Sequence, residues 1–227
     1  MTDFTALAHF LFQCANSRVP AHAHDQLEAL AQGMRLHQKG RGFQESFATA
    51  TRRFGSATIS LTTIETGELA RLGVIWPPIH RLDELVRIAM LTIAAADLTE
   101  PAYRVLIQDC YEHGDVRERR AILRALPFLP HGDRFLALAL EACRSHVLPI
   151  FEAIACENRY PAEHLPGQNF NQMVLRALFT ETAISRIVGL EKRITPELMQ
   201  MARDYASERQ AAGRSIPPDV RRLAHGE

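Results

Sequence analysis

The chain has 227 residues, of which 47% are hydrophobic and 23% are charged, and its formal net charge is zero. These values are ordinary for a soluble globular protein, and the balanced charge excludes nucleic-acid or membrane-surface binding that is driven by bulk electrostatics. The most hydrophobic run, residues 85–96, contains Arg87 and is too short to cross a bilayer, so we expect no membrane insertion. The first residues include Asp3 and no basic stretch, which is atypical of a secretory signal peptide.

The cysteines form no CxxC pair, and each lies within an apolar helical pattern. They are Cys14, Cys110, Cys143 and Cys156. This usage predicts reduced, buried thiols in a cytoplasmic protein. The chain contains no phosphate-binding glycine loop, no G-x-S-x-G elbow and no H-E-x-x-H motif. The sequence therefore predicts no cofactor and no metal site, and it reveals no reaction.

Helical periodicity begins near the N-terminus. Apolar spacing predicts helices over residues 4–16, 20–36 and 43–54. Residues 55–79 are rich in β-branched side chains, but a lone hairpin would lack a sheet to join, so we expect a loop with short helical turns. The two prolines of Trp76-Pro77-Pro78 cannot continue a helix. We therefore predict an N-terminal helical subdomain with an irregular seam over residues 1–79.

The second part, residues 80–227, is predicted to be the main helical body. Its first helices are expected over residues 82–96, 102–113, 116–126, 134–144 and 147–157. Short helices joined by tight breaks are typical of antiparallel neighbours that stack in layers. No sequence period repeats faithfully, so the predicted fold class is all-α, an irregular HEAT- or armadillo-like stack of short antiparallel helices.

The tripeptide His-Gly-Asp occurs in two of the breaks, at residues 113–115 and 131–133. We interpret each copy as a helix boundary, with Gly114 or Gly132 in the left-handed conformation and Asp115 or Asp133 capping the next helix. A metal site built from both copies is the less economical interpretation.

The stretch from Val147 to Phe179 joins two strongly apolar helices through a polar connector, residues 158–164. Pro166 and Gly167 break the chain, and Asn169 is then the expected N-cap of a buried helix, with Gln172 at capping-box distance. Farther on, Thr195-Pro196-Glu197 is a well-marked helix start.

Specific polar side chains on and around this connector are the candidate binding residues. They are Glu152, Asn158, Tyr160, His164, Asn171, Gln172 and Arg176. Asn171 lies on the apolar face of its helix, so its amide is expected to be buried and to need a partner, either a neighbouring loop or a ligand. Glu152 is expected to face solvent or to pair, for example with Arg176. His164 is either a backbone cap or a ligand.

The same region resembles the EboA-like family, from about Cys143 to Arg214. The resemblance rests on FEAIA at residues 151–155, NRYPAEH at 158–164, FNQMVLRALF at 170–179, ISRIVGLEKR at 184–193, TPEL at 195–198 and DYASERQAAGR at 204–214. The family pattern prefers Pro, His and Trp where this chain has Arg159, Ser207 and Gln210, so a role that needs that imidazole or indole does not transfer.

The resemblance implies an all-helical cytoplasmic protein that is encoded beside enzymes of a specialised-metabolite cluster, which makes a precursor such as a pigment monomer or moves it across the inner membrane. It implies no catalytic residue. The leading hypothesis is a non-catalytic scaffold or binding module that holds a pathway enzyme or an intermediate. The alternative is a small-molecule enzyme or metal-dependent protein in which His164 acts with Glu152 or Asp204 in a pocket under the connector. A homodimer through the last long helix is a further hypothesis.

Overall fold

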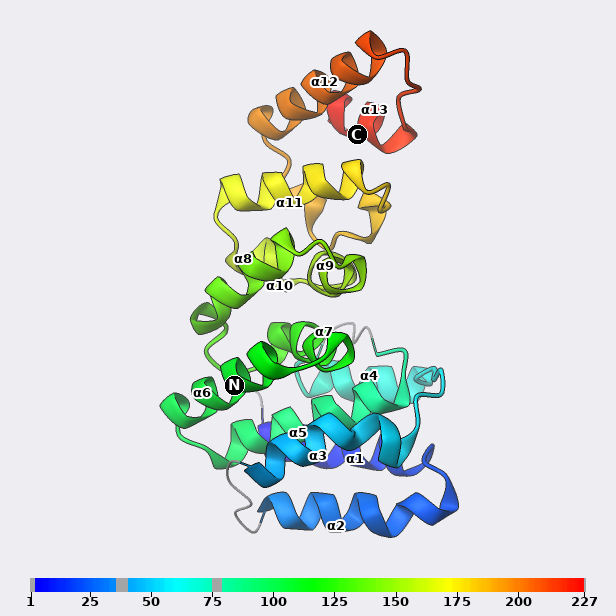
Figure 1. The fold of residues 1–227 in the computed structure, drawn as a ribbon, viewed down its shortest axis with the longest axis vertical. Helices are drawn as coiled ribbons and strands as arrows, with labels where there is room; N and C mark the ends of the chain where they lie inside the picture. Colours follow the sequence, from blue (N-terminus) through cyan, green and yellow to red (C-terminus); the bar gives the residue numbers. More distant parts are fainter. Residues whose placement is uncertain (1–2, 36–40, 75–78, 227) are drawn as a thin grey trace. The chain divides into compact units, whose positions relative to one another are not determined.

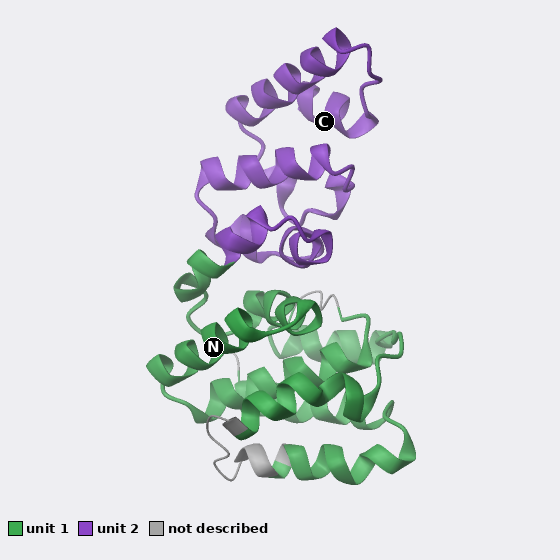
Figure 2. Cartoon of the chain, in the orientation of Figure 1, with its two compact units in different colours: residues 1–138 green, residues 139–227 purple. Residues whose placement is uncertain are grey.

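The structure is a computed structural model that describes residues 3–35, 41–74 and 79–226. Within these residues the fold is all-α, and its only β-type pairing is an isolated bridge between Thr58 and Arg81. The fold class is thus confirmed at this level. The chain divides into two compact units, residues 1–138 and 139–227, and the boundary falls inside helix α8 (Figure 2).

Unit 1 contains the first helices of the chain (Figure 1). They are α1 (Phe4–Asn16), η1 (Ala21–Ala23), α2 (His24–Arg35), α3 (Arg41–Phe54), α4 (Thr63–Arg71), α5 (Leu82–Asp97), α6 (Glu100–His113), α7 (Val116–Ala125), η2 (Leu126–Phe128), η3 (Gly132–Phe135) and the start of α8 (Leu136–Arg144). The predicted helices are therefore found, with ends that shift by a few residues. Leu36, the predicted end of the second helix, lies outside the described residues.

Helix α5 is the centre of unit 1. Every residue from Leu82 to Ala94 is buried, and the helix packs most extensively on α1, with further contacts to α2, α3, α6 and α7. A helix that is apolar around most of its circumference is expected at the middle of a helical layer. The hydrophobic run that is too short for a membrane span is thus a core helix.

Charged side chains are also buried on α5. Arg87 is 1% exposed and donates from Nη1 to Asp83 Oδ2 at 3.0 Å and from Nε to the Phe47 carbonyl oxygen at 2.9 Å. Thr51 Oγ1 donates to the same carboxylate at 2.7 Å. Buried charges are tolerated when they are paired and hydrogen-bonded in this way, and the pairs tie α3 to α5.

Residues 55–74 form the predicted loop with helical turns, and the turns are those of α4. Thr62 and Glu65 make a reciprocal capping box at the start of α4. The Glu65 carboxylate also accepts hydrogen bonds from Nη1 and Nη2 of Arg18, at 2.7 and 2.6 Å. These bonds connect α4 to the end of α1. Trp76-Pro77-Pro78 lies outside the described residues. The division expected at residues 79/80 falls inside unit 1, and it stays a prediction.

The His-Gly-Asp boundaries differ from the prediction in detail. Asp115 caps α7 as expected, since its carboxylate accepts from the backbone N–H groups of Arg117 and Glu118. Gly114, however, has φ −73° and is not left-handed. A Cβ there would lie 2.4 Å from the carbonyl oxygen of Cys110, so close backbone approach requires the glycine.

In the second copy the left-handed residue is His131, with φ 55°, and Asp133 lies inside η3 and does not cap it. Histidine is among the residues that adopt this conformation more readily than most non-glycine residues. The boundary role of both copies is therefore correct, but the assignment of Gly114 and Gly132 to left-handed positions and of Asp133 to a cap is wrong.

Unit 2 consists of the rest of α8 and the helices that follow it. They are α9 (Leu148–Ala155), α10 (Tyr160–His164), α11 (Gly167–Phe179), η4 (Ile184–Arg186), η5 (Leu190–Lys192), α12 (Pro196–Ala211) and α13 (Pro218–His225). Helix α11 contacts both α9 and α12, and α13 packs along α12 (Figure 1). The Thr195 side chain accepts from the Leu198 N–H, which confirms the predicted start of α12.

All four cysteines are free and buried, as predicted. Burial raises the pKa of Cys14, Cys110 and Cys143 to about 12 in each case. A thiol is far less reactive than a thiolate, so these side chains behave as small apolar core groups.

Candidate functional site

The predicted connector forms a short helix, α10, between α9 and α11 in unit 2. Asn158 is 1% exposed: its Nδ2 donates to the Ala153 carbonyl oxygen at 2.9 Å, and its Oδ1 accepts from the Tyr160 backbone N–H at 3.0 Å. The side chain therefore closes the end of α9 and opens α10, as an Asx-type turn does. Tyr160 is fully buried. These two candidate residues form the interior of the connector and not its surface.

Arg193, which sequence reasoning missed, holds the other end of the connector. Its guanidinium donates to the carbonyl oxygens of Ala162 and Leu165 at 2.6 and 2.8 Å, and it lies over the Phe170 ring at 4.6 Å. The last carbonyl groups of a helix lack intrahelical partners, and a cation is favoured at that end. A side chain about 30 residues farther along the chain thus fixes α10 against α11.

Glu152 pairs with Arg186, so the expected pairing with Arg176 is wrong. Arg186 Nη1 lies 2.6 Å from Glu152 Oε1, while its Nε and Nη2 reach the Glu157 carboxylate at 2.7 and 3.1 Å. Two carboxylates thus share one guanidinium, and their hydrogen bonds raise the pKa of Arg186. Glu157 has φ 49°, a conformation stabilised by its backbone N–H bond to the Arg186 carbonyl oxygen at 2.7 Å.

Arg176 contacts the turn between α8 and α9. Its Nη1 donates to the Arg144 carbonyl oxygen at 3.2 Å, and its Nη2 donates to the Ser145 carbonyl oxygen. The guanidinium lies 5.0 Å from the centre of the Phe151 ring. This candidate residue therefore completes the end of a helix, which explains why it does not reach Glu152.

The start of α11 differs from the prediction. The helix begins at Gly167, with Pro166 at the N-cap and no side-chain cap bond, so Asn169 lies in the first turn and the Asn169–Gln172 capping box is absent. The fixed φ of Pro166 suits the position before a helix, and the start lies three residues earlier than expected. Asn171 is buried, as predicted, and Gln172 is exposed. Among the described residues, no hydrogen bond is found for the Asn171 amide.

His164 ends α10, and its ring lies 4.4 Å from the Tyr160 ring, centre to centre. Asp204 on α12 accepts a hydrogen bond from Gln200 at 2.7 Å. Within the described ranges, no hydrogen bond or ion pair joins His164, Glu152 and Asp204, and no group of three or more His, Cys, Asp or Glu side chains could hold a metal ion. Each residue of the catalytic alternative instead contacts a residue outside that set.

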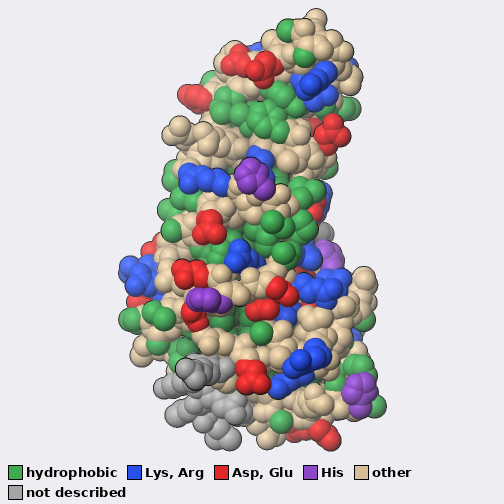
Figure 3. Space-filling view, viewed as in Figure 1, with side chains coloured by type: hydrophobic (Ala, Val, Ile, Leu, Met, Phe, Trp, Pro, Cys, Tyr) green, Lys and Arg blue, Asp and Glu red, His purple; other side chains and the backbone are tan. Residues whose placement is uncertain are grey.

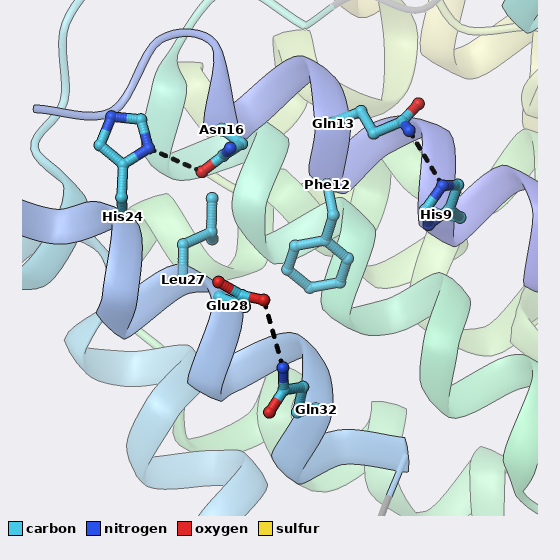
Figure 4. Close-up of a pocket in the computed structure, with 8 residues that line it drawn as sticks. All are labelled: His9, Phe12, Gln13, Asn16, His24, Leu27, Glu28 and Gln32. Atoms are coloured by element: carbon cyan, nitrogen blue, oxygen red, sulfur yellow. Dashed lines mark hydrogen bonds between the residues drawn. The ribbon is translucent and has the colours of Figure 1, made fainter. Parts of the chain in front are cut away.

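Three open pockets lined by described residues lie in unit 1, and none of these three is lined by residues of the connector. One lies between α1 and α2 (Figure 4), with a volume of about 370 Å³. Its lining residues are His9, Phe12, Gln13, Asn16, His24, Leu27, Glu28 and Gln32. No sequence motif marks this pocket, although His9 and Gln13 stand four residues apart and so share a helix face, as Glu28 and Gln32 do.

These features define an all-helical protein whose polar connector is held rigidly by guanidinium groups. No helix within the described ranges is long and apolar enough to cross a membrane. The family model for the metabolite traffic protein EboA matches residues 7–225, so this chain belongs to that family. The predicted resemblance is therefore confirmed, and it extends well beyond residues 143–214. Comparisons with curated proteins and with solved structures give no match.

Proposed function

We propose that this protein is a non-catalytic helical scaffold or binding module that serves the biosynthesis or export of a specialised-metabolite precursor. Membership of a family described as metabolite traffic proteins supports this role. The observation that carries the non-catalytic part is the pairing of Glu152 with Arg186 at 2.6 Å, because a general base needs a carboxylate that can accept a proton. The layered, HEAT- or armadillo-like stacking of short helices belongs to the same proposal, and the packing of α11 on both α9 and α12 supports it.

The binding surface in this proposal consists of the connector side chains that remain accessible, together with the neighbouring polar residue of α11. These are the exposed Glu163, the half-buried His164 and the exposed Gln172. Asn158 and Arg193 fix the backbone beneath them. Polar side chains that a rigid scaffold presents on a loop are well suited to recognition, because little conformational entropy is lost on binding.

The charge distribution agrees with a partner that is not a polyanion. On the face shown in Figure 3, basic and acidic side chains are interspersed with hydrophobic and uncharged ones, in keeping with the net charge of zero. Enzymes of the same metabolite pathway, or an intermediate, are the proposed partners, and the proposed location is the cytoplasm. We propose no nucleic-acid partner, because nucleic-acid binding depends on an excess of basic side chains that contact phosphates.

The test is capture of the neighbouring pathway enzymes by the purified protein and by its H164A/Q172A double variant. We expect the double variant to keep its melting temperature and to lose about tenfold or more in partner affinity, as truncation of residues central to an interface does. Glu191→Ala, an exposed change elsewhere in unit 2, is the matched control. Unchanged capture by the double variant would remove the connector from the proposal. Arg176→Ala is a poor probe because Arg176 stabilises the fold.

Homodimerisation through α12 stays a prediction. The apolar residues Leu198 and Ala202 of α12 are buried, and α13 packs on this helix within the same chain. A dimer through this helix would therefore have to use its exposed side or the edge of this buried face, where Tyr205 packs edge-on against the 54%-exposed Phe179. The prediction of a homodimer is tested by measuring the mass in solution of the native chain and of the Phe179→Ser variant.

A further inference from the structure

The pocket between α1 and α2 has an apolar floor. Phe12 and Leu27 form that floor and are themselves 7% and 2% exposed, and most of the accessible wall is apolar. The volume of about 370 Å³ lies at the lower end of the ~300–1,000 Å³ that is typical of small-molecule sites. The rest of the lining is polar. An apolar floor with a few convergent polar groups is the usual composition of a binding site for a small molecule.

The polar lining residues are paired with one another by hydrogen bonds. His9 Nε2 and Gln13 Nε2 lie 2.9 Å apart on α1. His24 Nδ1 and Asn16 Oδ1 lie 2.8 Å apart across the turn between the helices. Figure 4 shows one pair at each end of the pocket, with Phe12 between them.

A third pair comes from α2, where Gln32 Nε2 donates to Glu28 Oε1 at 3.3 Å. The three pairs fix the positions of their side chains without the help of a ligand. Such preorganisation lowers the entropy cost of binding.

Each pair leaves specific atoms for a ligand. Because an amide nitrogen only donates, His9 Nε2 must accept from Gln13, which leaves Gln13 Oε1 as an acceptor. Because Asn16 Oδ1 only accepts, His24 Nδ1 must donate, which leaves His24 Nε2 as an acceptor. Glu28 Oε2 and Gln32 Oε1 are further acceptors. The described residues provide no hydrogen bond to these four atoms. Donors are present as well, since the amides of Gln13, Asn16 and Gln32 keep N–H groups outside these pairs, so the lining offers both acceptors and donors.

The charge of the lining selects against anions. Among the described residues that line the pocket, Glu28 is the one acidic side chain, and none is a lysine or an arginine. A carboxylate or phosphate ligand would meet the like charge of Glu28 and could not use the free acceptors, whereas a hydroxyl group can donate to these acceptors and also accept from the amide N–H groups.

We propose that this pocket binds a small, uncharged, largely apolar molecule that carries hydroxyl groups. The inference rests on the proposed role in metabolite traffic, for which it names the ligand class and a place of binding in unit 1. The apolar body of the ligand covers Phe12 and Leu27, and its hydroxyl groups donate to the acceptors of the rim. Binding is reversible, and it requires no reaction.

The experiment titrates the full chain with cyclohexanol and with cyclohexanecarboxylate, which have the same ring and differ in the polar group, and follows binding by NMR chemical shifts. We expect the alcohol to bind more tightly than the anion. Gln13→Trp, at an exposed rim position, fills the pocket and should weaken alcohol binding by about tenfold, equivalent to 1.4 kcal/mol. Thr5→Trp, also exposed on α1 but outside the lining, should leave binding unchanged.

Glu28→Gln separates charge from shape. It removes the negative charge and keeps an acceptor, so binding of the carboxylate should strengthen by about threefold while binding of the alcohol changes little. The inference is overturned if the alcohol does not bind, if the anion binds more tightly to the native chain, or if Gln13→Trp binds as the native chain does. These outcomes leave the capture of partner enzymes through the connector untouched, so failure of the pocket and failure of the proposed function are distinguishable.

Discussion

At the scale of single residues, guanidinium groups organise unit 2. Arg176, Arg186 and Arg193 each bind carbonyl or carboxylate oxygens that lie about 30 residues away in the chain. The sequence indicated Arg176 and Glu152 as candidate binding residues because they are charged residues within apolar helices. Arg186 and Arg193 did not, because helical periodicity describes neighbours along one helix and carries no information about contacts at that separation.

Arg193 provides a direct test of this organisation. Arg193→Ala removes two charge-assisted hydrogen bonds and leaves the carbonyl groups of Ala162 and Leu165 without them. We expect the free energy of unfolding to fall by about 2 kcal/mol. Urea denaturation followed by circular dichroism measures it, and Arg214→Ala, an exposed arginine in the same unit, should change it little. An equal effect of the two changes would show that Arg193 does not hold the connector.

Glu65 makes stability depend on acidity in unit 1. The hydrogen bond from Arg18 lowers the pKa of the Glu65 carboxyl to about 2, from an ordinary 4.5. Since the pKa is lower in the folded state, the stabilisation is complete above the ordinary pKa and is lost as the pH falls from 4.5 towards 2.

Glu65→Gln keeps the capping geometry but removes this dependence, so its melting temperature should decline less steeply than that of the native chain between those values. Thermal unfolding at stepped pH measures the difference. Glu68→Gln is the control, since the ion pair that Glu68 makes within the described residues is with the exposed Arg71. If the melting temperature of Glu65→Gln fell with decreasing pH as steeply as that of the native chain, the proposed role of the Arg18–Glu65 pair would be contradicted.

At the scale of elements, apolar periodicity predicted where the helices lie, and it failed at their ends. Helix α5 is found almost as predicted because its burial is continuous. The start of α11 was misplaced because Asn169 is a good cap by type, yet Pro166 already sets the entry into the helix. Gly114 was misread because its requirement is steric and not a left-handed φ: the Cys110 carbonyl oxygen, four residues earlier, fills the space, and the residue type alone does not distinguish these two reasons for a glycine.

Two glycines allow that explanation to be tested. Gly114→Ala places a methyl group against backbone and should destabilise the protein by about 1–3 kcal/mol. Gly67→Ala, inside α4 and facing open space, should stabilise it by about 0.5–1 kcal/mol, because alanine loses less backbone entropy in a helix. Chemical denaturation of both variants measures the pair, and a stabilising Gly114→Ala would contradict the close approach.

At the scale of the whole molecule, the chain divides into two compact units, residues 1–138 and 139–227. We expect local changes to act within their own unit, because opening free energies follow cooperative contact groups. Hydrogen exchange with mass spectrometry should show Glu65→Gln, measured at low pH, altering protection within residues 3–138, and Arg193→Ala altering it within residues 139–226. Equal changes in both units after either substitution would contradict this independence.

The buried thiols are distributed evenly between the units, with Cys14 and Cys110 in the first and Cys143 and Cys156 in the second. An alkylating reagent can attack each sulfur only while the surrounding helices are open and the thiol is ionised. The four cysteines can therefore report on local opening in the native chain. The order in which the cysteine-containing peptides gain the mass of the reagent shows which unit opens first. Such a record needs no introduced label and could be made while a pathway enzyme or a small hydroxylated ligand is bound.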